Sequence, residues 1–138
     1  MKETRESLEA GMDLELTELA CPTCDARLYS GWRSPFVDDC QYCCTGCARR
    51  VEVLHLDLIA AEIRERIDAA DESFWVQYHR QIESRLAACP CGGTFAHDAP
   101  RRCLACATLL PDVAVDREIS FVDDAARYDG ILVETRWR

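Results

Sequence analysis

The chain has 138 residues, of which 25 are acidic, 16 are basic and ten are cysteine, and its formal net charge is −9. Because 49% of the residues are apolar, the sequence predicts one folded domain or two small ones rather than a disordered chain. No apolar run approaches the roughly 20 residues that a membrane span needs, so we expect no membrane association. A polyanion would be repelled by so acidic a chain, which disfavours general nucleic-acid binding.

The cysteines indicate metal ligation rather than disulfides. The charged N-terminal residues, Met1 to Ser7, have no apolar stretch of the secretory kind, so we expect a cytoplasmic protein. Disulfides are rare in that compartment, whereas short cysteine pairs commonly bind a tetrahedral ion.

The first half of the chain is predicted to begin with a flexible arm over residues 1–12. A first zinc ribbon follows over residues 13–56, because two cysteine pairs alternate there with short strand-like segments. The strand-like segments cover residues 13–19, 27–29, 41–43 and 51–56.

Residues 57–88 have a helical period and are predicted to connect two ribbons, as one bent helix or as two helices. Asp71 or Ser73 is the expected N-cap of a second helix. The apolar stripe is expected to pack on the ribbons, with a partly exposed docking face as the alternative. Its members are Ile59, Ile63, Ile67, Trp75, Tyr78, Ile82 and Leu86.

A second ribbon is predicted over residues 89–111, where Cys-x-Cys-Gly-Gly is followed by Cys-x-x-Cys. Residues 112–138 are predicted to form strands at 119–122 and 131–133, joined as a short β-hairpin by the turn residues Tyr128 to Gly130.

The ligands of the second ribbon are predicted to be Cys89, Cys91, Cys103 and Cys106. Four thiols complete a tetrahedral shell, so His97, which lies between the two pairs, is expected to be a surface residue.

The first ribbon offers six cysteines for four positions. Cys21 and Cys24 can be completed by Cys40 and Cys43 or by Cys44 and Cys47. We favour Cys44 and Cys47, because Gly46 suits a tight turn and a strand follows directly. Cys40 and Cys43 are then spare thiols on the preceding strand.

These four cysteine pairs resemble those of the zinc-ribbon (rubredoxin-like) superfamily, over about residues 19–56 and 87–110. The resemblance implies two structural Zn²⁺ ions, although iron accepts the same four thiolates. The expected fold is a small metal-stabilised α+β protein, with two zinc ribbons joined by a helical segment and a short C-terminal β-hairpin. Zinc-ribbon proteins bind nucleic acid, polymerases, ribosomes or other proteins.

We therefore expect a non-enzymatic, acidic protein-binding module with a basic partner, such as an inhibitor, an immunity protein or an adaptor. Catalysis is disfavoured because thiolates close both shells, and because His55, His79 and His97 form no catalytic metal motif. The alternative is a nucleic-acid-, polymerase- or ribosome-associated ribbon. A local basic and aromatic patch would carry it, made of Trp32, Arg33, Arg49, Arg50, Arg101 and Arg102.

Overall fold

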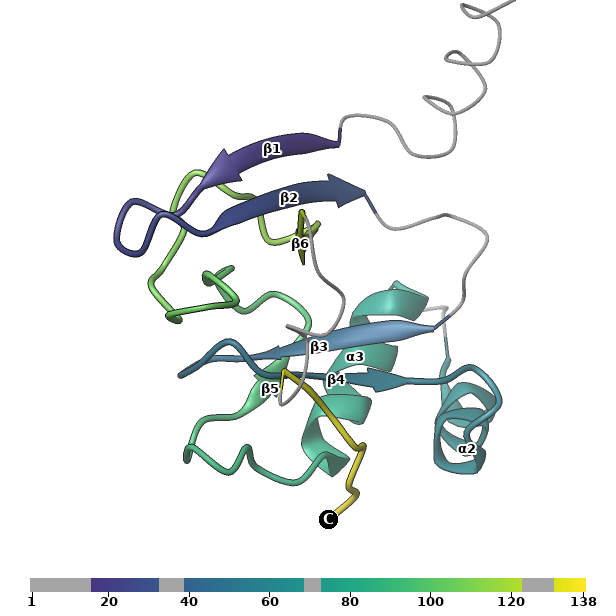
Figure 1. Ribbon diagram of the computed structural model, residues 1–138. Helices are drawn as coiled ribbons and strands as arrows, with labels where there is room; N and C mark the ends of the chain where they lie inside the picture. The colour runs from purple at the N-terminus through teal and green to yellow at the C-terminus, as the bar shows by residue number, and fades with distance from the viewer. Residues whose placement is uncertain (1–15, 33–38, 69–72, 123–130) are drawn as a thin grey trace, which may run out of the picture. The chain divides into compact units, whose positions relative to one another are not determined.

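The computed structural model describes residues 16–32, 39–68, 73–122 and 131–138 (Figure 1). The chain divides into two compact units, each built from two separate stretches. Unit 1 comprises residues 1–37 and 100–129, and unit 2 comprises residues 38–99 and 130–138. This division differs from the predicted succession of two ribbons along the chain, because most of unit 2 is inserted into unit 1. The predicted arm, residues 1–12, and the predicted turn, residues 128–130, lie outside the described residues.

Unit 1 contains a three-stranded antiparallel sheet in the order β1-β2-β6. Its strands are β1 (Thr17–Ala20), β2 (Arg27–Trp32) and β6 (Arg117–Phe121). Among the described residues of this unit, the buried apolar side chains other than cysteine are Leu28, Leu104, Leu110, Ile119 and Phe121. Small units with a limited apolar core commonly need a metal ion to fold.

Unit 2 contains a four-stranded sheet in the order β5-β3-β4-β7. Its strands are β3 (Cys40–Cys44), β4 (Arg50–Val53), β5 (Phe95–Ala96) and β7 (Leu132–Val133). β3 pairs with β4 and with β5 in antiparallel fashion, whereas β7 runs parallel to β4.

The helical segment forms two helices, α2 (Leu58–Arg66) and α3 (Phe74–Arg85). Both belong to unit 2, so the segment is not the predicted connector between two ribbons. Asp57 caps α2, since its carboxylate accepts hydrogen bonds from the backbone N–H groups of Ile59 and Ala60 at 2.8 and 3.3 Å. Ser73 is the N-cap residue of α3 but makes no side-chain capping bond. Asp71, the other predicted cap, lies outside the described residues.

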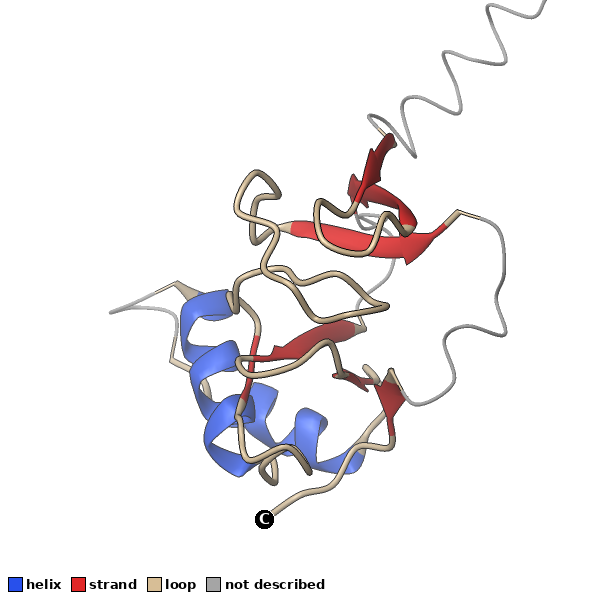
Figure 2. Ribbon diagram, turned by 60° about the vertical axis from the view of Figure 1, so that its left-hand side comes forward, coloured by secondary structure: helices blue, strands red, loops and turns tan. Residues whose placement is uncertain are grey.

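The two helices lie next to each other, with the strands of unit 2 to one side of them (Figure 2). Most of the apolar stripe packs there, because Ile63, Tyr78 and Ile82 are at most 3% exposed. Trp75 differs, since it is 48% exposed. The core of unit 2 combines residues from both helices and the sheet, namely Tyr42, Cys44, Val51, Val53, Ala60, Ile63, Tyr78, Ile82, Leu86, Cys89 and Phe95.

The predicted C-terminal β-hairpin is wrong, because β6 and β7 belong to different sheets. β6 pairs with β2 in unit 1, whereas β7 pairs with β4 in unit 2. There the backbone N–H of Arg50 donates to the carbonyl of Ile131 at 2.8 Å, and the Thr135 hydroxyl donates to the carbonyl of Glu52 at 2.7 Å. Alternating apolar residues mark a strand but do not specify its partner. Neither α2 nor α3 is long and apolar enough to cross a membrane.

The capping difference between the two helices gives a matched test. Asp57→Ala should lower the free energy of unfolding of unit 2 by about 1 kcal/mol, because two N–H groups of α2 lose their acceptor. Ser73→Ala should change it by less than about 0.5 kcal/mol, because this side chain makes no capping bond. Urea unfolding followed by circular dichroism at a fixed metal concentration measures both, and equal losses would contradict the assignment.

Candidate metal centres

Eight of the ten cysteines converge in two groups of four. Within each group the sulfur atoms all lie within 4.8 Å of one another. Unit 1 holds Cys21, Cys24, Cys103 and Cys106, and unit 2 holds Cys44, Cys47, Cys89 and Cys91.

The sulfur spacing fits one tetrahedral ion in each group. A metal–sulfur bond of about 2.3 Å puts tetrahedral sulfur atoms about 3.8 Å apart. In unit 1 the sulfur of Cys21 lies 3.6 Å from that of Cys106, and Cys24 lies 3.7 Å from Cys103. In unit 2 Cys44 lies 3.4 Å from Cys91, and Cys47 lies 3.6 Å from Cys89. Each group could therefore hold a metal ion, consistent with zinc-ribbon-like motifs.

The two knuckles of unit 1 have the same backbone design. The N–H of Cys21 donates to the carbonyl of Ala26 at 2.9 Å, and the N–H of Cys103 donates to the carbonyl of Thr108 at 2.8 Å. The residue after the second cysteine adopts a left-handed conformation in both, with φ 63° at Asp25 and 66° at Ala107. The two turns thus present their thiols in equivalent ways.

In unit 2 the pairing of β3 with β5 brings two unlike knuckles together. The Cys44 knuckle uses the longer turn, in which the N–H of Cys44 donates to the carbonyl of Arg49 at 2.8 Å. The other turn is one residue shorter, since the N–H of Cys89 donates to the carbonyl of Gly93 at 2.9 Å. Gly92 supplies the positive φ of 95° that closes it.

Backbone N–H groups point at the sulfur atoms in both units. Each donor belongs to the residue two positions after the cysteine, and such bonds stabilise the thiolate form that a metal ion needs. The donors are Thr23 to Cys21 at 3.4 Å, Gly46 to Cys44 at 3.2 Å, Arg49 to Cys47 at 3.4 Å, Gly93 to Cys91 at 3.4 Å and Ala105 to Cys103 at 3.3 Å.

Each group contains thiols of contrasting acidity. Burial raises the pKa of Cys44 and of Cys103 to about 12. By contrast, a hydrogen bond from the Gly93 backbone lowers the pKa of Cys91 to about 7, and the Thr108 side chain lowers the pKa of Cys106 to about 6. Metal binding must therefore displace protons from the buried thiols, which makes the affinity depend on pH.

The pairing of the knuckles differs from the prediction. The spacing predicts one centre from Cys21, Cys24, Cys44 and Cys47, and a second from Cys89, Cys91, Cys103 and Cys106. The structure instead pairs the first knuckle of the chain with the fourth and the second with the third, so one group lies within the other along the sequence. Spacing could not reveal this, because closing a loop four times longer costs only about 1.2 kcal/mol more in chain entropy.

Cys40 and Cys43 lie on β3 and belong to neither group of four. The structure places Cys44 and Cys47 at the metal centre of unit 2, at the end of β3, where the chain turns toward β4.

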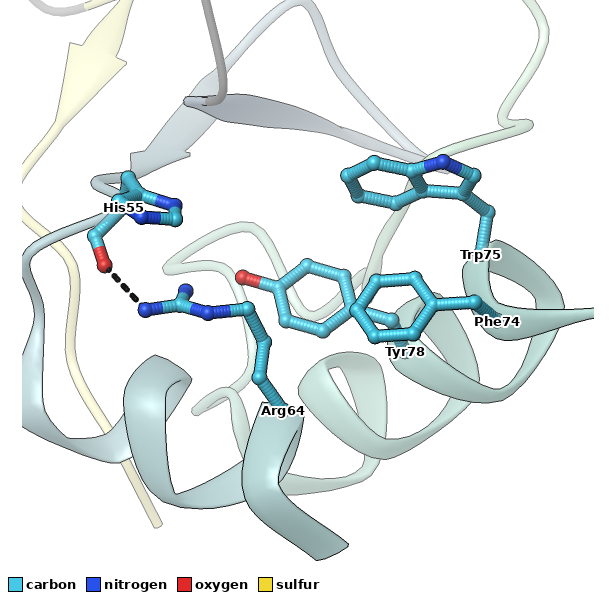
Figure 3. A pocket seen from close by; sticks show the side chains of 5 residues that line it. All are labelled: His55, Arg64, Phe74, Trp75 and Tyr78. Carbon is cyan, nitrogen blue, oxygen red and sulfur yellow. Dashed lines mark hydrogen bonds between the residues drawn. The ribbon is translucent and has the colours of Figure 1, made fainter. Parts of the chain in front are cut away.

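His97 lies in a different cluster, with Glu83 and Asp98. Its Nδ1 is 2.5 Å from the Glu83 carboxylate, and its ring stacks on that of His79 with centroids 4.2 Å apart. Burial lowers the pKa of His79 to about 4, and the Tyr42 hydroxyl lies 2.8 Å from its Nδ1. Sequence reasoning did not find Glu83 or Asp98, because their positions carry no motif. His55 lies elsewhere in unit 2, where it lines a small pocket with Arg64, Phe74, Trp75 and Tyr78 (Figure 3).

The arginines beside the knuckles make hydrogen bonds within the protein. Arg49 donates to the Cys47 sulfur at 3.8 Å, and this contact raises the pKa of the guanidinium. Arg101 donates to the carbonyls of Val115 and, at 2.7 Å, of Arg117. Arg102 donates to the carbonyl of Ala107 at 2.9 Å. Arg33 lies outside the described residues.

A family model described as "Domain of unknown function (DUF8255)" matches residues 17–111, more than half of the chain. The chain belongs to this family. The matched region contains all eight thiols of the two groups and ends before β6. Searches of curated proteins and of solved structures found no match.

Double substitutions test the nested pairing. Cys24→Ser with Cys106→Ser removes two ligands of one group, so the protein should retain one metal ion per chain. Cys24→Ser with Cys47→Ser disrupts both groups and should leave none. As the control, Cys40→Ser with Cys43→Ser should retain two. Elemental analysis of the purified variants measures these ratios, and the reverse order of the first two would restore the sequential pairing.

Gly93 tests the close approach of the two knuckles in unit 2. An added Cβ at this position would lie 2.7 Å from the Cys44 sulfur and 3.0 Å from the Gly46 nitrogen. Gly93→Ala should weaken metal binding in unit 2 by about 10- to 100-fold, as measured by competition with a chromogenic chelator. Gly46→Ala is the control, because its Cβ would make only an ordinary 3.4 Å contact with Cys91. Equal metal affinities of the two variants would show that the close approach of the two knuckles at Gly93 does not limit metal binding.

Proposed function

We propose that this protein is a non-enzymatic, acidic protein-binding module that carries two structural Zn²⁺ ions and docks on a basic protein partner. An inhibitor, an immunity protein or an adaptor is the role that suits such a module.

The observation that carries the proposal is the closed set of four thiols in each unit. A catalytic zinc ion usually has three protein ligands and keeps a position for water or substrate, whereas a structural ion is enclosed by four. The N–H groups directed at the sulfurs occupy the outer shell in the manner of a structural site. The sites are therefore best suited to stabilise the fold. Iron bound to four thiolates is the competing metal, and elemental analysis separates the two.

The arginine contacts favour a protein partner over a nucleic acid. Arg101 and Arg102 are bound to backbone carbonyls, and Arg49 lies against a thiol of the unit 2 centre. Two Zn(Cys)₄ centres would add negative charge to a chain whose formal charge is already −9. Phosphate groups would meet repulsion from this charge, whereas a basic protein surface would be attracted.

Exposed acidic residues are available to meet such a partner. Asp112 and Asp116 in unit 1 and Glu134 in unit 2 are all exposed. Exposed charges of this kind mainly accelerate encounter, so their contribution should appear in the association rate and should decrease with salt.

The test is affinity capture with the zinc-loaded chain at low and high salt, followed by association kinetics with the captured protein. Asp112→Lys with Asp116→Lys should slow association by about tenfold at low salt, without releasing zinc. Asp112→Glu with Asp116→Glu keeps the charge and should behave as the native chain does. Salt-sensitive binding to bare duplex DNA or RNA near physiological salt would favour the nucleic-acid alternative instead.

A further inference from the structure

The chain crosses between the two units three times. It passes from unit 1 to unit 2 between residues 37 and 38, returns between residues 99 and 100, and enters unit 2 again between residues 129 and 130. Both ends of the inserted stretch, residues 38–99, are therefore tied to unit 1, which contains the first and the last knuckle. Folding of unit 2 must change the length of free chain that separates these two knuckles.

The metal centre of unit 1 closes the longer loop of the two. Its thiols of Cys24 and Cys103 are 79 residues apart in the sequence, whereas those of Cys47 and Cys89 in unit 2 are 42 residues apart. The entropic cost of bringing the ends of a flexible loop together rises with the length of the loop. If unit 2 is unfolded, the centre of unit 1 must bear this cost for the whole intervening chain.

The folded unit 2 shortens that loop, because β3 and β5 lie side by side in its sheet (Figure 1). Cys43 on β3 faces Ala96 on β5 in the register of this pair. The free path between the knuckles of unit 1 then runs only from Cys24 to Cys43 and from Ala96 to Cys103. This path measures about 26 residues instead of 79, so the loop that remains to be closed is about threefold shorter.

The sheet of unit 1 benefits in the same way. β2 and β6 pair with each other although the inserted stretch of unit 2 lies between them in the sequence. In the folded unit 2, β3 pairs with β4, and β4 pairs with β7. Only the connecting segments 33–39 and 122–131 then separate the strands of the two sheets along the chain. A folded unit 2 therefore favours both the metal centre and the sheet of unit 1.

Unit 2 has the better means to fold first. Its thiols close the shorter loop, and its hydrophobic core combines residues of two helices and of the sheet with the ligands Cys44 and Cys89. The described residues of unit 1 include no helix and a smaller set of buried apolar side chains. Metal binding and folding share one free energy in such units, so the ion of unit 2 should be taken up before that of unit 1.

We propose that the two metal centres load in order and cooperatively: unit 2 binds its ion first, and its folding raises the affinity of unit 1 for Zn²⁺ by about fivefold. The factor follows from the threefold shorter loop, because the probability of loop closure varies as about the −3/2 power of loop length. Linkage requires the ion of unit 1 to raise the affinity of unit 2 by the same factor. Limiting zinc is thereby concentrated in doubly loaded chains. The inference rests on the metal ions of the proposed function and is independent of the partner.

The first test measures the zinc affinity of unit 1 with unit 2 folded and unfolded. Cys44→Ser, Cys89→Ser and Ile82→Asp together remove two ligands and place a charge in the core, so unit 2 should unfold with both helices, which circular dichroism verifies. Competition with a chelator should then give about fivefold weaker binding at unit 1 than in the native chain. Leu56→Ser is the control and should change nothing, because Leu56 is 87% exposed. Equal affinities of unit 1 in the unfolded variant and the native chain would overturn the proposal.

The reciprocal variant and a zinc titration test the symmetry and the order. Cys21→Ser with Cys103→Ser removes two ligands of unit 1, and the zinc affinity of unit 2 should fall by the same factor of about five. One equivalent of Zn²⁺ added to the metal-free native chain should shift the amide signals of Gly46 and Gly93, which belong to unit 2, before that of Ala105 in unit 1. An unchanged affinity of unit 2 would overturn the coupling, and earlier shifts in unit 1 would overturn the order.

A longer connection tests whether the chain itself transmits the coupling. About 50 Gly and Ser residues inserted between residues 37 and 38 lengthen the loop of unit 1 to about 76 residues with unit 2 folded and to about 129 with it unfolded. The ratio of the two affinities of unit 1 should then fall from about fivefold to about twofold. An undiminished ratio would overturn the proposed origin in chain connectivity.

The outcomes separate this inference from the proposed function. A native chain without bound zinc would contradict both. Two bound zinc ions whose affinities do not depend on each other would overturn the cooperative loading and leave the structural zinc ions and the protein partner of the proposed function standing.

Discussion

Four thiols must meet at one point in each unit, and the rest of the structure is arranged around that requirement. Each point is reached by two tight turns from distant parts of the chain, Cys21 to Cys24 with Cys103 to Cys106 in unit 1, and Cys44 to Cys47 with Cys89 to Cys91 in unit 2. An ion bound in each unit would join two stretches of chain, so two ions would join four stretches at two places. In units with short strands and few buried side chains, that linkage supplies stability that the apolar core alone does not.

The two centres are integrated with their units in different ways. In unit 2, Cys44 and Cys89 are members of the hydrophobic core that also contains Tyr42, Ile63 and Ile82, so the metal centre and the helices stabilise one another. In unit 1, two equivalent turns supply the four thiols, and the described residues of this unit include a three-stranded sheet but no helix. Loss of the ion of unit 2 should therefore destabilise both helices, because Cys44 and Cys89 pack in the same core as Ile63 and Ile82.

Unit 2 contains a metal centre and also a small pocket that shares no residue with it, lined by Arg64 and aromatic side chains. The metal centre is closed by four thiols, and backbone N–H groups and Arg49 donate hydrogen bonds to its sulfur atoms. The pocket, by contrast, is lined by the Arg64 side chain and by the indole of Trp75, which is 48% exposed.

Local chemistry determined what the sequence could reveal. The eight thiols that form the two groups were identifiable, because a knuckle is a turn of a few residues whose N–H groups bind its own sulfurs. The helical stripe was identifiable too, because period and burial go together for Ile63, Tyr78 and Ile82. The choice of knuckle partners, the separate sheets of β6 and β7 and the inclusion of both helices in unit 2 were decided only by tertiary structure. These features depend on contacts between segments that are distant in the sequence. A tetrahedral centre can be formed by any two knuckles that the fold brings together, as the pairing of β3 with β5 does in unit 2. The internal hydrogen bonds of Arg101 and Arg102 likewise involve carbonyls farther along the chain or across a turn, which cysteine spacing does not encode.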